Sequence, residues 1–142
     1  SALISILSTN VDKEVIDSGE NLKIIANYGA GFNNVDVDYA REKNIDVTNT
    51  PKASTAATAE LTFGLVLAIA RRIVEGDKLS RTKGFDGWAP LFFRGREVSG
   101  KTLGIIGFGE IGSAVAKRAK GFDMDILYTG PHQKKEKERE LT

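Results

Sequence analysis

The sequence predicts an α/β protein with parallel strands, and two observations lead to that prediction. Short apolar segments alternate with segments of helical character along most of the chain, an order typical of strands joined by helical crossovers. One apolar segment, residues 103–106, also runs directly into three glycines spaced as G-x-G-x-x-G, and a helix-forming segment at residues 113–120 follows. A strand, a glycine turn and a helix in this order form the unit that opens a dinucleotide-binding domain.

The glycine turn carries most of the functional information. Gly107 permits the tight turn, Gly109 allows the backbone to approach phosphate groups, and Gly112 allows the helix to pack close to its strand. The helix N-terminus then offers N–H groups and a partial positive charge to a pyrophosphate. Because loops collect glycines for ordinary turns, the pattern indicates a dinucleotide only in this strand and helix context. A second strand at residues 125–128 and a charged, solvated helical segment at residues 132–140 are expected to follow.

The first fifty residues contain three expected strands and two expected helices. Asn10 is a possible N-cap of the first helix, and Asp36 can cap the second. A loop with two glycines, residues 27–34, precedes the second helix. The expected strands are residues 2–7, 22–26 and 45–47, and the expected helices are residues 11–17 and 37–43.

Pro51 interrupts this alternation and introduces a long helix. Ser54 or Thr55 can cap a helix that continues to about residue 74, a length of roughly 30 Å. Apolar residues occur nearly all round this helix, so we expect it to be buried between two layers or two subunits. Beyond it, residues 83–96 form an irregular aromatic segment, which we expect in a core or an interface rather than as a base-stacking platform.

Composition and charge exclude several other classes of function. The chain has 142 residues, no cysteine and a formal net charge of +1. Disulfide and thiolate chemistry are therefore excluded, and nothing indicates binding to nucleic acid or to an anionic membrane. The longest apolar run, residues 64–70, is too short to cross a bilayer, and no metal-ligand cluster is evident. The first residues lack the basic start of a signal peptide, so we expect a cytoplasmic protein.

Three stretches match one known family in order and spacing. They are NYGAGFNNVD at residues 27–36, NTPKASTAATAELTFGLVLAIARR at residues 49–72 and GREVSGKTLGIIGFGEIGSAVAKRAKGFDMDILY at residues 95–128. Together they resemble the D-isomer-specific 2-hydroxyacid dehydrogenases. The resemblance implies part of a flavodoxin-like substrate domain at residues 1–50, joined to the first part of a Rossmann dinucleotide-binding domain at residues 51–142. It also implies a cleft between the two domains and a homodimer.

The resemblance assigns roles to residues of two loops. By position, Ala30 and Gly31 offer backbone N–H groups to a substrate carboxylate, and Ala30 approaches the nicotinamide. Two consecutive N–H groups in a glycine-rich turn can form an anion nest, although a plain tight turn would look the same. Asn33 stands where the family commonly has an acidic residue, which leaves the hydrogen bonding of this loop open. Glu110 and Ile111 stand where the family places backbone contacts to the pyrophosphate, so the Glu110 carboxylate should point away from the phosphates.

The choice between NAD and NADP depends on the cofactor-binding position Gly130. An acid that holds the ribose 2′-OH closes the second strand of this fold, about 20 residues beyond the glycines. No Asp or Glu stands beside Gly130, and loss of that acid is the first step toward accepting the 2′-phosphate of NADP. His132, Lys134 and Lys135 could supply positive charge, although Pro131 replaces the usual arginine. The YTG sequence that ends at Gly130 resembles NADP-using glyoxylate and hydroxypyruvate reductases, so NADP is favoured over NAD.

By the same resemblance, the residues that perform the chemistry lie outside this chain. Reduction of a 2-keto acid needs a cation and a proton source besides a hydride donor, and the family supplies an Arg, a Glu and a His beyond residue 142. The only histidine here, His132, is expected at the surface or near the cofactor ribose. We therefore expect an inactive internal fragment of an oxidoreductase with no catalytic residue of its own. Glyoxylate or hydroxypyruvate is the favoured substrate of the parent enzyme, and phosphoglycerate or lactate is the second choice.

Two other functions remain open at this point. A non-catalytic dinucleotide-binding or redox-sensing module of the same family would lack the Arg, Glu or His beyond residue 142. A small scaffold protein with an accidental glycine loop would show no response to a cofactor. Ser54, Thr55 and Thr58 are interpreted as residues that start the long helix. A contact of Thr55 with the cofactor is the less favoured alternative.

Overall fold

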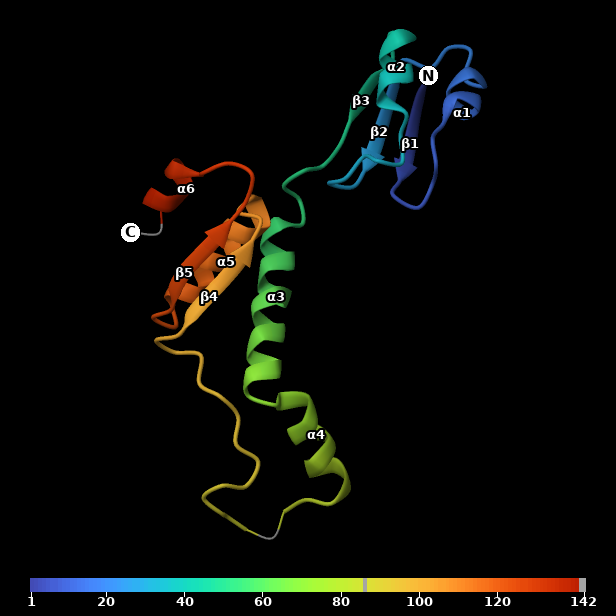
Figure 1. Ribbon diagram of the computed structural model, residues 1–142. Coiled ribbons are helices and arrows are strands. Elements are labelled where there is room, and N and C mark those ends of the chain that lie inside the picture. Colours follow the sequence, from blue (N-terminus) through green and yellow to red (C-terminus); the bar gives the residue numbers. More distant parts are fainter. Residues whose placement is uncertain (86, 141–142) are drawn as a thin grey trace. The chain divides into compact units, whose positions relative to one another are not determined.

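The computed structural model describes residues 1–85 and 87–140. Within it the chain forms two compact units, Ser1–Ser54 and Thr55–Thr142, and each is described by itself (Figure 1). Residue 86 of the aromatic segment and residues 141 and 142 lie outside the described part. No helix of the described residues is long and apolar enough to cross a membrane.

The first unit is a three-stranded parallel sheet with two short helices. The strand order is β1-β2-β3, and the pairing places Ile4 beside Ala26 and Ala26 beside Thr48. Parallel neighbours require crossover connections, which the helices supply, so the expected α/β class is confirmed. The elements are β1 (Ala2–Ile6), α1 (Lys13–Asp17), β2 (Ile24–Tyr28), α2 (Val37–Glu42) and β3 (Asp46–Thr48).

The start of α1 differs from the sequence-based prediction. The helix begins at Lys13 with Asp12 as its N-cap, whose carboxylate accepts a hydrogen bond from the Val15 N–H at 3.1 Å. Asn10 is therefore not the cap, and Val11 is not helical. Val11 instead forms a parallel bridge with Val35, because both of its backbone groups bond to neighbours of Val35. The predicted cap of α2 is confirmed, since the Asp36 carboxylate accepts from the Tyr39 N–H at 3.0 Å.

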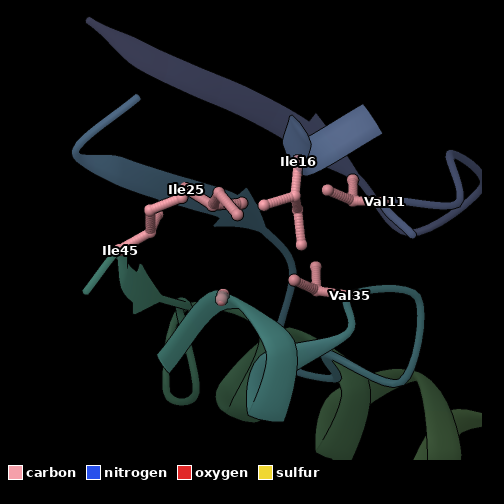
Figure 2. Close-up of a cluster of buried hydrophobic side chains, with 6 residues drawn as sticks. Val11, Ile16, Ile25, Val35 and Ile45 are labelled. Atoms are coloured by element: carbon pink, nitrogen blue, oxygen red, sulfur yellow. The ribbon is translucent and has the colours of Figure 1, made fainter. Parts of the chain in front are cut away.

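A small apolar cluster holds the first unit together. Figure 2 shows how side chains from α1, β2 and the segment after β2 point toward one another. Burial removes these side chains from water, which is the main favourable term in folding. The opposite face of β1 is open, since Ile4 and Ile6 are exposed. The buried members of the cluster are Val11, Ile16, Ile25, Val35, Ala40 and Ile45.

The second unit is a parallel strand pair packed against helices. α3 lies along α5 (Figure 1). Apolar side chains of these two helices form the core of this unit together with Met124. Phe63 of α3 contacts Phe122, with ring centroids 5.0 Å apart. The elements are α3 (Thr55–Ala70), α4 (Ile73–Thr82), β4 (Thr102–Ile106), α5 (Glu110–Lys120), β5 (Asp125–Thr129) and α6 (Lys135–Arg139).

The predicted long helix is two helices, because the chain turns after Ala70. Arg72 has a left-handed backbone with φ of 56°, and α4 starts directly after it. The Ala70 carbonyl accepts a hydrogen bond from the Arg96 N–H at 2.7 Å, so a distant segment satisfies the end of α3. The Arg72 guanidinium lies 4.2 Å from the ring centroid of Phe93 and also bonds to Glu75, which lowers the pKa of that carboxyl. These tertiary contacts end the helix earlier than its apolar pattern predicts.

Within this unit the long helix and the aromatic segment are largely exposed, and their expected burial in a core or a subunit interface stays a prediction. Only Ala59 and Phe63 of α3 are buried. Leu61, Leu65 and Ile69 are exposed and lie four residues apart, so they share one face of the helix. The aromatic segment has no helix or strand among its described residues. Its exposed large side chains are Phe85, Trp88, Leu91 and Phe92.

Candidate functional site

The G-x-G-x-x-G turn lies where β4 ends and α5 begins (Figure 1). Gly107 has φ of 90°, a conformation that side-chain-bearing residues rarely adopt, and its N–H donates to the Thr129 carbonyl at 2.8 Å. The turn is therefore tied to the end of β5. α5 begins at Glu110 with Gly109 as N-cap, three residues earlier than the sequence predicted. Its first N–H groups face out of the helix end, where helix geometry gives them no intrahelical acceptor.

Gly112 brings the helix against the turn. A Cβ on Gly112 would collide with the carbonyl oxygen of Gly107 and would lie 3.2 Å from Cγ2 of Ile105. Only glycine allows this approach without moving the backbone. The third glycine thus has the packing role that the sequence predicts for it.

The space over the turn is open. A Cβ built on Gly109 meets no atom within 4 Å, and the same holds for Gly107. Gly109 has no side chain that could cap the helix. An anion could therefore approach the N–H groups of the first turn of α5, where the helix dipole favours negative charge. The residues present fit a pyrophosphate.

Glu110 and Ile111 occupy the first two positions of α5. The Glu110 carboxylate accepts a hydrogen bond from Nζ of Lys137 at 2.7 Å, and its side chain is 52% exposed. Ile111 is also exposed. Both residues stand where the predicted backbone contacts would lie.

Gly130 follows directly after β5 and lies beside the turn. A Cβ on it would be 4.0 Å from the Phe108 nitrogen. Phe108 is buried and stacks on Tyr128, with ring centroids 4.1 Å apart and an interplanar angle of 14°. The Tyr128 hydroxyl donates to Glu138, a contact that raises the pKa of Tyr128 and lowers the pKa of Glu138. The segment after β5 is thus attached to the glycine turn through one aromatic pair.

The loop with Ala30 and Gly31 belongs to the first unit and is exposed. The Ala30 carbonyl accepts from Nδ2 of Asn49 at 2.8 Å, and the Gly31 carbonyl accepts from Nδ2 of Asn27 at 2.8 Å. Within the described part of the chain, the N–H groups of Ala30 and Gly31 donate no hydrogen bond. Two carbonyls are therefore fixed while two neighbouring N–H groups stay available to an anion.

A network of side-chain amides, which was not predicted from the sequence, holds this loop. Asn27 is buried at the end of β2, accepts from the Ser5 hydroxyl at 2.9 Å and exchanges contacts with the Asn34 amide. Asn34 also donates to the carbonyls of Ile6 at 3.1 Å and Thr9 at 2.9 Å. Asn34, rather than Asn33, therefore organises the loop. The signal in the sequence that could have indicated this network is an asparagine at the end of an apolar strand.

Other candidate features lie elsewhere. A cavity of about 850 Å³ includes no residue of the glycine turn; it is lined by Arg71, Phe93, Arg94, Gly95, Arg96, Glu97 and Lys101. His132 is exposed in the segment after β5, and Thr55 is the first residue of α3. Among the described residues, no three His, Cys, Asp or Glu side chains form a group that could hold a metal ion.

Parallel strands, helical crossovers and a glycine turn at the end of a strand define a Rossmann-type α/β protein. Residues 1–135 match the family model of the D-isomer specific 2-hydroxyacid dehydrogenase catalytic domain. The chain belongs to this family, which confirms the resemblance found in the sequence.

Known relatives agree with this assignment. The chain is 92% identical over 141 residues to a Staphylococcus haemolyticus protein whose name, 2-hydroxyacid dehydrogenase, is itself a prediction. The match covers 99% of this chain and 44% of the relative. A Staphylococcus aureus protein with the same type of name is 83% identical over 140 residues, again covering 99% of this chain and 44% of the relative. The chain thus spans less than half the length of these relatives.

Solved structures show the same fold. The TT0316 protein of Thermus thermophilus has a TM-score of 0.88 and 45% identity, covering 93% of this chain and 42% of its own. The D-lactate dehydrogenase of Aquifex aeolicus, complexed with NAD and lactic acid, has a TM-score of 0.84 and 28% identity, with 97% and 41% covered. An acyclic imino acid reductase in complex with NADPH and D-Arg has a TM-score of 0.81 and 31% identity, with 94% and 43% covered.

Proposed function

We propose that this chain serves an enzyme that transfers a hydride between a nicotinamide dinucleotide and a small 2-keto or 2-hydroxy acid. The observation that carries the proposal is the open glycine turn at the N-terminus of α5. A glycine at position 112 is what allows the helix to approach this turn so closely. When bound, a nicotinamide cofactor supplies the hydride. This chain's part is to hold the pyrophosphate with the N–H groups that follow Gly109.

A second part of the proposal concerns the substrate. We assign the Ala30 and Gly31 N–H groups to the carboxylate of the 2-keto acid, with Ala30 also next to the nicotinamide. Support comes from the two fixed carbonyls of this loop and its two available N–H groups. We accordingly assign residues 1–50 to a partial substrate domain and residues 51–142 to a partial cofactor domain.

The proposed cofactor form is NADP. Gly130 occupies the position of the acid that would hold a ribose 2′-OH, and the neighbouring Thr129 and Pro131 carry no charge. Lys134 and Lys135 follow closely and are exposed, so they could meet a 2′-phosphate. Glyoxylate or hydroxypyruvate is the proposed substrate, on the likeness of the YTG sequence to reductases that use NADP.

The proposed function is tested in a chimera that supplies the rest of the enzyme. Residues 1–142 replace the matched part of the Staphylococcus haemolyticus relative, and the unmodified relative is the control. We expect the chimera to oxidise NADPH with glyoxylate or hydroxypyruvate, and to use NADH less well. A chimera that oxidises neither cofactor while the relative does would contradict the function, and a strong preference for NADH would contradict only the cofactor form.

The 142-residue chain alone is proposed to be inactive, because the family's Arg, Glu and His are not among its matched motifs. Turnover by the purified chain would overturn this statement directly. We also propose that the enzyme is a homodimer, for which the exposed apolar face of α3 (Leu61, Leu65 and Ile69) is the supporting observation.

A further inference from the structure

The charged segment after β5 reaches back to the glycine turn. Nζ of Lys137 lies 2.7 Å from Oε1 of Glu110 and 3.3 Å from Oγ of Ser113. Both partners belong to the first turn of α5, 27 and 24 residues earlier in the chain. The Lys137 side chain is only 24% exposed, which is unusual for a lysine on a five-residue surface helix. Its position is therefore specific.

Several contacts hold Lys137 in place. Tyr128, stacked on Phe108, donates its hydroxyl to Glu138, the residue after Lys137. The same hydroxyl accepts the Lys134 N–H at 3.0 Å. Nε2 of Gln133 donates to both oxygens of Glu138 at 3.2 and 3.1 Å. α6 is thus fixed to β5 and to the turn, and the ammonium of Lys137 has a defined place.

A lysine ammonium at the N-terminus of a helix requires an explanation. The N-terminus of a helix carries partial positive charge, which disfavours a cation and favours an anion. A negative charge at position 110 suits the helix dipole, but the Glu110 carboxylate would repel a pyrophosphate that binds the N–H groups of the first turn. Lys137 removes that conflict, since an ion pair has no net charge.

We propose that Lys137 is a positioning residue for the dinucleotide: it neutralises Glu110, so that the pyrophosphate meets the helix N-terminus without an opposing carboxylate. This inference rests on the proposed dinucleotide site and adds a residue that the G-x-G-x-x-G pattern does not contain. Lys137 acts through Glu110, and its effect depends on charge. It therefore concerns NAD and NADP alike, because both carry the pyrophosphate.

The test is a binding titration of the 142-residue chain with three probes. NADH and ADP-ribose contain the pyrophosphate, whereas adenosine is uncharged. We expect Lys137→Ala to raise the Kd for NADH and ADP-ribose about fivefold, the scale of an exposed ion pair, and to leave adenosine binding unchanged. Lys137→Arg should keep the wild-type Kd. Lys120→Ala, which removes an equal charge from the exposed end of α5, is the matched control and should have no effect.

A double-mutant cycle separates charge from structure. In a Glu110→Gln background, Lys137→Ala should no longer weaken ADP-ribose binding, because no carboxylate remains to be neutralised. The difference between wild type and Lys137→Ala should also shrink at high salt. Equal weakening in both backgrounds, or equal loss of adenosine binding, would overturn the role of Lys137 and leave the dinucleotide site intact. Wild-type chain that binds neither NADH nor ADP-ribose would overturn the site itself, and the inference with it.

Discussion

The carbonyl oxygen of Gly107 occupies the place where any larger residue at position 112 would put its Cβ. Two glycines five residues apart thus determine how closely α5 approaches the end of β4. Gly109, between them in the turn, has no neighbour within 4 Å of a Cβ. The three glycines of the pattern therefore have separable roles: Gly107 adopts the positive φ of the turn, Gly109 leaves room over it, and Gly112 allows close packing of the helix.

The first prediction follows from this separation. Gly112→Ala should destabilise the second unit by about 1–3 kcal/mol, because the methyl group overpacks the turn. Gly109→Ala should cost less than about 1 kcal/mol, since alanine is only a poorer N-cap and its methyl group meets no atom. Yet Gly109→Ala should weaken ADP-ribose binding more than tenfold by filling the space over the N–H groups. Urea unfolding and binding titration of both variants measure these effects, and equal loss of stability in the two would contradict the assignment.

The second prediction concerns the buried amide of Asn27. Asn27→Ala removes the acceptor of the buried Ser5 hydroxyl and the donor to Oδ1 of Asn34, and it should destabilise the first unit by about 2–3 kcal/mol. Asn49→Ala removes one exposed hydrogen bond to the Ala30 carbonyl and should cost less than about 1 kcal/mol. Urea midpoints give both values. An Asn27→Ala variant as stable as wild type would show that the network does not hold the loop.

A third prediction concerns acid stability. Asp17 accepts from Lys43 at 2.8 Å and from the Tyr39 hydroxyl at 2.8 Å, and these contacts lower the pKa of Asp17 below its ordinary value of 3.8. A lowered folded-state pKa gives stability that is present above 3.8 and is lost as the pH falls through the folded value. The urea midpoint of the first unit should therefore decrease as the pH falls below 3.8.

The variant Asp17→Asn should lack this part of the acid transition. Glu20→Gln, which removes an exposed carboxylate from the same unit, should retain it. Identical pH profiles for Asp17→Asn and wild type would show that the Asp17 contacts do not contribute. The contribution of this ion pair to stability is modest, because the side chains of Asp17 and Lys43 are both about half exposed.

The fourth prediction tests the proposed dimer. Leu65 and Ile69 are exposed on one face of α3, so a charge at either position would have to be buried in an interface on that face. Leu65→Glu and Ile69→Glu should shift the mass measured by light scattering from dimer to monomer. Lys120→Glu, which introduces a carboxylate at an exposed position of α5, is the control. A wild-type chain that is monomeric at high micromolar concentration would contradict the proposal.

The part of the molecule that local rules control could be predicted from the sequence. The glycine turn, β4 and β5 follow from apolar runs and glycine spacing, and Asp36 was recognised as a cap because its carboxylate bonds only three residues ahead. The start of α5 was placed too late because its cap, Gly109, has no side chain that could mark the start of the helix in the sequence.

Contacts between distant segments could not be predicted in this way. The end of α3 depends on the Arg96 N–H, and the left-handed Arg72 depends on the ring of Phe93, which lies 21 residues later. The ion pair between Glu110 and Lys137 joins residues that no helical or strand period relates. Each requires the folded arrangement of its unit, which the pattern of one segment does not contain.

The central claim is that the N–H groups at the start of α5 bind a pyrophosphate. The most direct test is the amide NMR spectrum of the 15N-labelled chain during titration with ADP-ribose. We expect the largest shifts at Gly107, Gly109, Ile111, Gly112 and Gly130, with saturation at a single Kd. Unchanged signals for these residues at millimolar ADP-ribose, or shifts confined to other parts of the chain, would contradict the claim.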